Sequence, residues 1–173
     1  MIYRKITQID NMNDPIKPAK KQGARTKFFP PYALMIGLLG CSLLDSFLVH
    51  LPIFKGNMIF LILGLAIAVT SFLTAIYTLK IFSDNEESPH PKSLQNQLFL
   101  GGTFKYSRNP IYLAMVTILL SCGLAFNSWW YTIAAIISVP LLTYGVIIPE
   151  EKYLEKEFGK VYLEYKSTVR RWL

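Results

Sequence analysis

The sequence predicts an all-α integral membrane protein: a bundle of about four transmembrane helices with a C-terminal amphipathic helix at the membrane interface. Three observations indicate this fold class. Hydrophobic residues make up 52% of the 173 residues and charged residues only 17%, which leaves too little polar surface for an ordinary soluble domain. The apolar residues gather in long runs. The basic residues lie between those runs and not on one face, so the net charge of +7 does not indicate a nucleic-acid partner.

Four apolar segments, each bounded by turn-forming residues, are the candidate transmembrane helices. They cover residues 32–51, 58–82, 111–126 and 129–148. Crossing a hydrocarbon core of ~30 Å takes roughly 20 residues at about 1.5 Å per residue, so the third segment is short for a full span. Only Asn127 and Ser128 separate the last two segments, which predicts a helical hairpin. Pro140 predicts a kink in the fourth segment.

The distribution of Lys and Arg predicts the orientation in the membrane. Of the 18 basic residues, seven precede the first span, four lie between the second and third spans, and six follow the fourth. With four spans, only Lys55 lies on the other side. The positive-inside rule then places both termini in the cytoplasm, with the protein in the inner membrane if its source is bacterial. We expect residues 1–29 to be a disordered basic tail and residues 30–173 to form the membrane domain.

The residues after the fourth span have a different pattern. Apolar residues recur there at helical spacing and charged residues occupy the other face, which predicts an amphipathic interfacial helix, anchored by Arg170, Arg171 and Trp172. Within the first span, the charge of Asp45 is costly unless paired, so we expect Asp45 near an end of the helix, beside a polar partner such as Ser42 or Thr74, or in a cavity, and we favour structural pairing. The cysteines at positions 41 and 122 lie inside apolar segments, so no disulfide framework or metal site is indicated.

Two polar turns border the predicted hairpin. Residues 101–112 read Gly-Gly-Thr-Phe-Lys-Tyr-Ser-Arg-Asn-Pro-Ile-Tyr, and residues 149–151 read Pro-Glu-Glu. Each has a purely structural interpretation, in which Asn109 caps a helix and the glutamates complement the dipole of the next one. The hairpin, however, brings the end of the fourth span beside the start of the third. We therefore expect Glu150 and Glu151 to converge with Arg108 and Asn109, forming a site for a cationic, partly polar ligand.

These turns, together with the tail from residue 153 onwards, resemble the integral-membrane methyltransferases of the isoprenylcysteine carboxyl methyltransferase and phospholipid methyltransferase group. The resemblance covers about residues 95–173. It implies transfer of a methyl group from S-adenosyl-L-methionine to a carboxylate or amine of a lipid or other lipophilic small molecule, within a membrane-lipid environment.

Carried over by position, the resemblance also implies site residues. The catalytic residues would be Arg108, Asn109, Tyr112 and Glu151. The cofactor-binding residues would be Asn96, Gln97, Leu98, Phe99, Gly102, Phe104, Asn109, Pro110, Tyr112 and Glu150. An amine acceptor would need a base, for which His90 and Glu151 are the candidates.

The chain departs from the family pattern at two places. Asn109 stands where the prenylcysteine enzymes usually have His, and Val146 and Ile147 occupy the region where those enzymes carry a substrate-facing Arg. A prenylcysteine handled in the same way is therefore not implied. Two other classes stay open: a non-enzymatic membrane subunit for assembly or transport, and a membrane reductase of similar build. No Gly-x-Gly-x-x-Gly motif supports the reductase.

Overall fold

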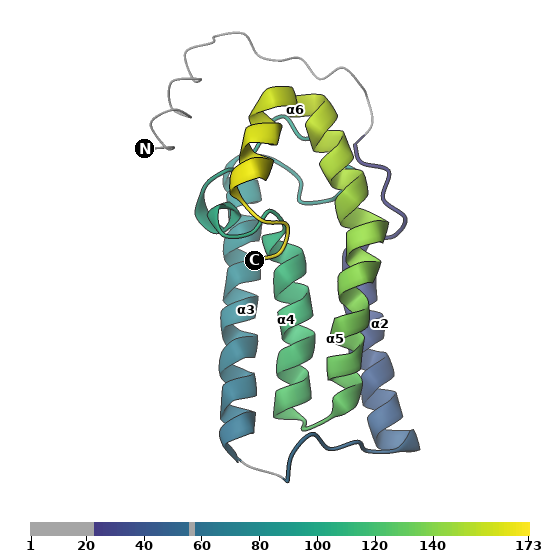
Figure 1. Cartoon of the computed structure of the whole chain (residues 1–173). Helices are drawn as coiled ribbons and strands as arrows, with labels where there is room; N and C mark the ends of the chain where they lie inside the picture. Colours follow the sequence, from purple (N-terminus) through teal and green to yellow (C-terminus); the bar gives the residue numbers. More distant parts are fainter. Residues whose placement is uncertain (1–22, 56–57) are drawn as a thin grey trace.

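The computed structural model describes residues 23–55 and 58–173, and every regular element in those ranges is helical. Four long helical segments run side by side (Figure 1): α2 (Pro30–Leu43) with the π-helical turn η2 (Leu44–Leu48), α3 (Met58–Asp84), α4 (Pro110–Ala125) and α5 (Trp129–Leu142). The π-helical turn η4 (Thr143–Ile147) joins α5 to α6 (Ile148–Thr168), and the 3-10 helix η3 (Gly102–Lys105) precedes α4. The predicted fold class is confirmed.

Three helical stretches are long and apolar enough to cross a membrane: Pro30–Leu48, Met58–Asp84 and Trp129–Thr168. Helix α4 is apolar but shorter, as the sequence predicted. The third stretch has 40 residues, a length of about 60 Å against a hydrocarbon core of ~30 Å. Its charged residues begin directly after Pro149. We therefore treat residues 129–148 as the span and the rest of α6 as lying beyond it.

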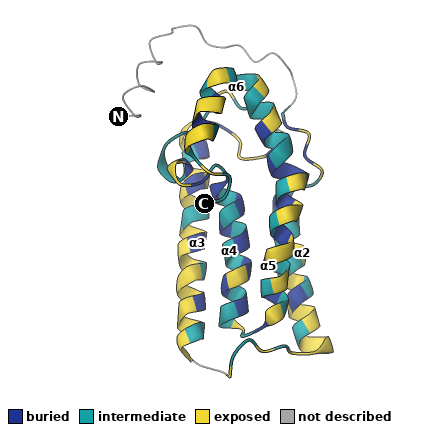
Figure 2. Ribbon diagram, in the orientation of Figure 1, coloured by how far each residue is buried: buried dark blue, intermediate teal, exposed yellow. Residues whose placement is uncertain are grey.

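Helix α4 is the centre of the bundle, in contact with α2, α3 and α5. Helices α3 and α4 lie close together at Gly64, where a Cβ atom would lie 2.7 Å from the backbone nitrogen of Ala125. The hydroxyl of Ser71 on α3 also donates a hydrogen bond to Thr117 on α4, at 2.8 Å. Small and hydroxyl-bearing residues hold helices together in bilayers in this way. Figure 2 shows α4 largely buried and α3 largely exposed on its outer face.

The end of the bundle that carries the α4–α5 turn is closed by polar contacts to this turn. The hydroxyl of Ser128 donates to the Asp45 carboxylate at 2.7 Å, and His50 Nδ1 lies 3.0 Å from the same Asp45 oxygen. The expected pairing of Asp45 is confirmed, but its partners are Ser128 and His50 and not the suggested Ser42 or Thr74. Asp45 lies in η2, at the end of the first span and level with the turn, so the turn supplies its partner.

Two residues of the expected N-terminal tail contact η4, whereas residues 1–22 lie outside the described residues. The Lys27 N–H donates to the Gly145 carbonyl at 2.9 Å, and a Cβ atom on Gly145 would lie 2.4 Å from a ring carbon of Phe28. The π-helical turn thus offers a carbonyl and a space without a side chain to the chain that precedes α2. The expected disorder of the tail stays a prediction.

The amphipathic segment after the fourth span forms α6, with a break that the sequence analysis did not predict. Gly159 has non-helical angles (φ 53°, ψ −124°). The second half of α6 consequently returns toward η3 and the start of α4 (Figure 1). Its Tyr162 and Tyr165 pack with Phe82 and Phe104 in one apolar cluster.

Candidate functional site

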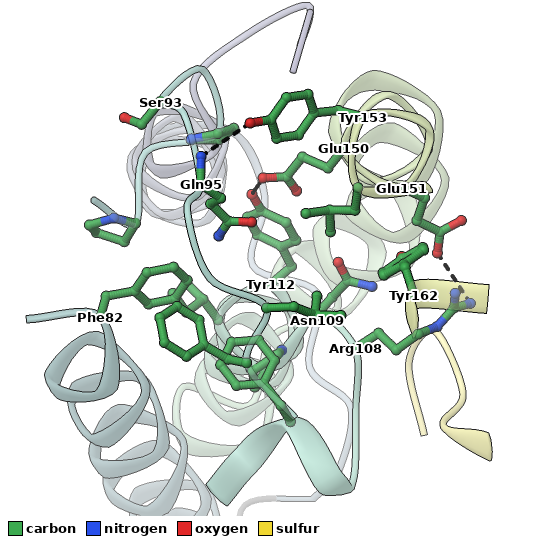
Figure 3. A pocket seen from close by; sticks show the side chains of 18 of the residues that line it. Phe82, Ser93, Gln95, Arg108, Asn109, Tyr112, Glu150, Glu151, Tyr153 and Tyr162 are labelled. Carbon is green, nitrogen blue, oxygen red and sulfur yellow. Dashed lines mark hydrogen bonds and ion pairs between the residues drawn. The ribbon is translucent and has the colours of Figure 1, made fainter. Parts of the chain in front are cut away.

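A cavity lies at the end of the bundle where α4 and α6 begin (Figure 3). It encloses about 780 Å³ of empty space, a figure that includes space open to solvent. The wall is built from the end of α3, residues 89–99, η3, the start of α4 and both halves of α6. The polar residues of the lining include Arg108, Asn109, Tyr112, Glu150 and Glu151.

The start of α4 places Asn109 and Tyr112 in the cavity wall. Pro110 occupies the beginning of the helix, as predicted. The Asn109 side chain makes no capping hydrogen bond, so the predicted capping role is wrong. Its Nδ2 donates instead to the Arg171 carbonyl at 2.9 Å. Tyr112 lies within the first turn of α4 and is buried.

Tyr112 and Glu150 meet across the hairpin. The Tyr112 hydroxyl donates to Oε1 of Glu150 at 3.1 Å. No cation among the described residues pairs with Glu150. Burial raises the pKa of Glu150 to about 7; the Tyr112 hydrogen bond opposes this rise, and the nearby charge of Glu151 adds to it. Glu150 is therefore a half-buried carboxyl whose pKa lies well above that of an ordinary exposed glutamate.

Glu151, one residue further along, is bound by two arginines. Arg171 donates from Nε and Nη2 to its two oxygens at 2.9 and 2.8 Å, and Nη2 of Arg108 lies 3.2 Å from Oε1. The predicted role of Arg171 and Trp172 in an interfacial anchor is wrong, since Arg171 engages Glu151 and Trp172 packs against the core of the bundle. The adjacent glutamates thus have different surroundings.

Aromatic residues form the wall on the other side of the cavity. The rings of Phe82 and Phe99 have centroids 4.9 Å apart, and Phe104 lies 5.9 Å from Phe99. Figure 3 shows this aromatic group facing the polar residues. The chain that precedes Phe99 is held against α6 because the Gln95 N–H donates to the Tyr153 hydroxyl at 3.1 Å.

Most of the residues singled out from the sequence come together here. Those lining the cavity are Leu98, Phe99, Phe104, Arg108, Asn109, Pro110, Tyr112, Glu150 and Glu151. Asn96, Gln97 and Gly102 are not among the lining residues. Gly102 is needed for its conformation: its φ is +59°, and a Cβ atom would lie 2.8 Å from the Ile81 side chain.

Sequence reasoning missed Gln95, Tyr153 and Arg171. Tyr153 was one member of the apolar stripe of α6, Arg171 was assigned to an interfacial anchor within the tail that carries the family resemblance, and Gln95 carried no signal. Val146 and Ile147, which stand in the region of the prenylcysteine enzymes' arginine, are fully buried in the bundle core. They do not line the cavity and supply no charge to it.

A second, apolar cavity adjoins the first. It has a volume of about 560 Å³ on the same measure, and its lining includes Phe29, Leu79 and Met115. Tyr112 and His90 line both cavities. The His90 ring stacks on Phe29 with centroids 4.9 Å apart.

Comparison with known proteins agrees with this arrangement. Residues 57–161 match the phospholipid methyltransferase family, which is more than half of the chain and includes α3, α4, α5 and the first part of α6. A 63-residue protein of Haemophilus influenzae, described as uncharacterized, is 38% identical over its full length, covering 36% of this chain. The chain therefore belongs to the phospholipid methyltransferase family, whose membrane methyltransferases generally use S-adenosyl-L-methionine.

Proposed function

We propose that this protein transfers a methyl group from S-adenosyl-L-methionine to a lipophilic, membrane-associated acceptor at the cytoplasmic face of the membrane. The observation that carries the proposal is the half-buried Glu150 carboxyl, which lines the cavity beside Tyr112 and has no cationic partner among the described residues. A charge withdrawn from water is costly unless an opposite charge compensates it. The ammonium group of the methyl donor would supply that charge.

The cavity suits the rest of the donor as well. Phe82, Phe99 and Phe104 offer the flat apolar surface on which a purine ring packs well. Glu150 would hold the ammonium, while Tyr112 and Asn109 lie within the same wall to orient the polar part.

When bound, S-adenosyl-L-methionine supplies a methyl group that the acceptor's lone pair attacks, while the carbon–sulfur bond breaks and its electrons return to sulfur. The protein's task is to align the two molecules and to exclude water. The second cavity supports an apolar acceptor, because Phe29, Leu79 and Met115 offer a surface for a hydrocarbon group. Tyr112, which is common to both cavities, would separate the two molecules.

Both candidate bases, Glu151 and His90, already take part in interactions within the protein. The carboxylate of Glu151 is shared by two guanidinium groups. His90 Nδ1 accepts the Lys92 N–H at 3.1 Å, so the neutral ring carries its proton on Nε2 and is a donor there. This arrangement favours an acceptor that arrives with a free lone pair, such as a carboxylate, over a protonated amine.

The charge pattern supports the cytoplasmic location of the site. Every basic residue except Lys55 precedes α2, lies from the end of α3 to the start of α4, or follows α5. The described parts of these segments, residues 23–29, the end of α3 to the start of α4, and α6, lie at the cavity end of the bundle (Figure 1). The positive-inside rule assigns that end to the cytoplasm.

Calorimetric titration of the protein in detergent with S-adenosyl-L-methionine tests the proposal. We expect saturable binding that weakens as the pH falls through about 7, because protonation removes the charge of Glu150. Glu150→Gln should weaken binding roughly tenfold or more, since it removes a charge-assisted hydrogen bond. Glu164→Gln is the matched control, because this exposed residue of α6 does not line the cavity.

Incubation with labelled donor and a total lipid extract then identifies the acceptor. Label in a carboxylate would agree with the engaged bases, and label in a headgroup amine would contradict that part of the proposal. Absence of saturable donor binding would contradict the methyltransferase proposal as a whole. Tight binding of a nicotinamide nucleotide instead would favour the reductase alternative.

A further inference from the structure

The segment after α6, residues 169–173, returns to the start of α4 and holds it through backbone carbonyls. The Arg108 N–H donates to the Arg170 carbonyl at 3.0 Å. The Arg171 carbonyl accepts from Asn109 Nδ2 at 2.9 Å and from the Ser107 hydroxyl at 3.3 Å. Three donors of the turn before α4 are thus bound by two consecutive carbonyls, so the position of this turn depends on the segment.

The Arg171 side chain acts on the other wall of the cavity. It binds both oxygens of Glu151, with the two hydrogen bonds at 2.9 and 2.8 Å, in the fork geometry that makes Arg–carboxylate pairs strong and specific. Only 6% of the Glu151 side chain is exposed. Arg171 therefore touches the start of α4 through its carbonyl and the start of α6 through its guanidinium.

This bridging gives the adjacent glutamates different roles. Both Glu151 oxygens are occupied by guanidinium groups, whereas Glu150 has one partner, the Tyr112 hydroxyl. The negative charge of Glu151 raises the pKa of Glu150. A guanidinium on Glu151 offsets that charge, and so favours the ionised form of Glu150.

We propose that Arg171 is a positioning residue of the methyl-donor site: by holding Glu151 and Asn109 in place, it leaves Glu150 as the carboxylate that meets a cationic ligand. The inference rests on the proposed function, and it adds the segment after α6 to the site. If Arg171 only stabilised the fold, its removal would affect stability and affinity without changing the pH at which binding weakens. If Arg171 also balances the charge of Glu151, its removal changes that pH.

The test measures S-adenosyl-L-methionine affinity from pH 5.5 to pH 8 for Arg171→Ala, Arg171→Lys and Arg171→Ala/Glu151→Gln, with unfolding temperature in parallel. Arg171→Ala should bind more weakly, and its binding midpoint should move to higher pH by roughly several tenths of a unit or more, because Glu151 becomes uncompensated. Adding Glu151→Gln should move the midpoint back down. Lys160→Ala, which removes an exposed basic side chain of α6 that does not line the cavity, should match the unchanged protein.

Each outcome decides the matter. An unchanged affinity and midpoint in Arg171→Ala would overturn the inference while leaving the proposed function intact, and so would weaker binding with an unchanged midpoint. No binding by the unchanged protein would overturn both. If Arg171→Ala does not fold, Glu151→Gln alone serves: the inference predicts a midpoint below that of the unchanged protein, and an unchanged midpoint contradicts it. The donor's own amine titrates in every variant, so only differences between variants are interpreted.

Discussion

At the scale of single residues, the site depends on the state of Glu150. Two opposing effects act on its carboxyl. Burial favours the neutral form and dominates, whereas the Tyr112 hydroxyl favours the charged form, and the resulting pKa is about 7. A modest change in surroundings therefore switches the charge of Glu150 within the physiological range. A cationic ligand that pairs with this carboxyl would shift it toward the ionised form.

Tyr112→Phe tests the contribution of this hydrogen bond. Removing the hydroxyl takes away the only group that lowers the pKa of Glu150, so the carboxyl should hold its proton to higher pH. We expect donor affinity at pH 7 to fall by roughly tenfold to 150-fold, since a hydrogen bond to a charged group contributes about 1.5–3 kcal/mol. The midpoint for binding should move to higher pH. Calorimetric titration at several pH values measures both.

Tyr106→Phe is the matched control for that variant. Tyr106 lies six residues before Tyr112 and is 75% exposed, so its loss of a hydroxyl should leave affinity and midpoint unchanged. Equal behaviour of the two variants would mean that the contact between Tyr112 and Glu150 does not govern ligand binding.

Residue-level features of the site were predictable in part. The convergence of Glu150 with Asn109 and Tyr112 followed from adjacency of two hairpin ends, which hydropathy alone defines. The contacts of Arg171 could not be predicted in this way. They depend on where an irregular segment returns after a helix, and no local pattern specifies that position.

At the scale of elements, the break in α6 decides which residues reach the cavity. Periodicity predicted an amphipathic helix, and the periodic residues are indeed helical. Gly159 interrupts it with a positive φ, a conformation that costs other residues free energy but suits glycine. The interruption was not predicted because a single glycine within a helical pattern is usually tolerated.

Gly159→Ala should therefore impair the site without any steric clash. A Cβ atom at this position would have no neighbour within 4 Å, so only the backbone conformation (φ +53°) opposes it. We expect a loss of about 1–2 kcal/mol in the free energy of unfolding, and weaker donor binding because Tyr162 and Arg171 follow the break. Thermal unfolding in detergent and calorimetric titration measure the two effects.

Gly40→Ala is the comparison for this substitution. Gly40 lies in α2, where a Cβ atom also has no neighbour within 4 Å but the backbone is helical. Replacing it should be neutral or slightly stabilising. If Gly159→Ala were equally harmless, the positive φ would not be required for the return of α6.

At the scale of the whole molecule, the bundle itself followed from the sequence. The four apolar runs, the tight turn at Asn127 and the short third span all have direct counterparts in the structure. They were predictable because a bilayer requires continuous helices of set length. The central position of α4 was not predicted, since it reflects packing among small residues that hydropathy does not rank.

The arrangement gives the two ends of the molecule different characters. One end is closed by polar contacts among Asp45, His50 and Ser128. The other end carries both cavities, the two glutamates and nearly all of the basic residues that the structure describes. A polar ligand would enter at the second end, and an apolar one from the surrounding lipid.

The most direct test is an experimental structure of the protein with S-adenosylhomocysteine, the product left after methyl transfer. We predict that the ligand occupies the cavity between α4 and α6, with its ammonium group within hydrogen-bond distance of Glu150. Its purine should lie against the phenylalanine wall, and its sulfur should point toward the second cavity. A ligand bound elsewhere, or bound in the cavity with its ammonium remote from Glu150, would contradict the assignment of this carboxyl as the cation-binding group.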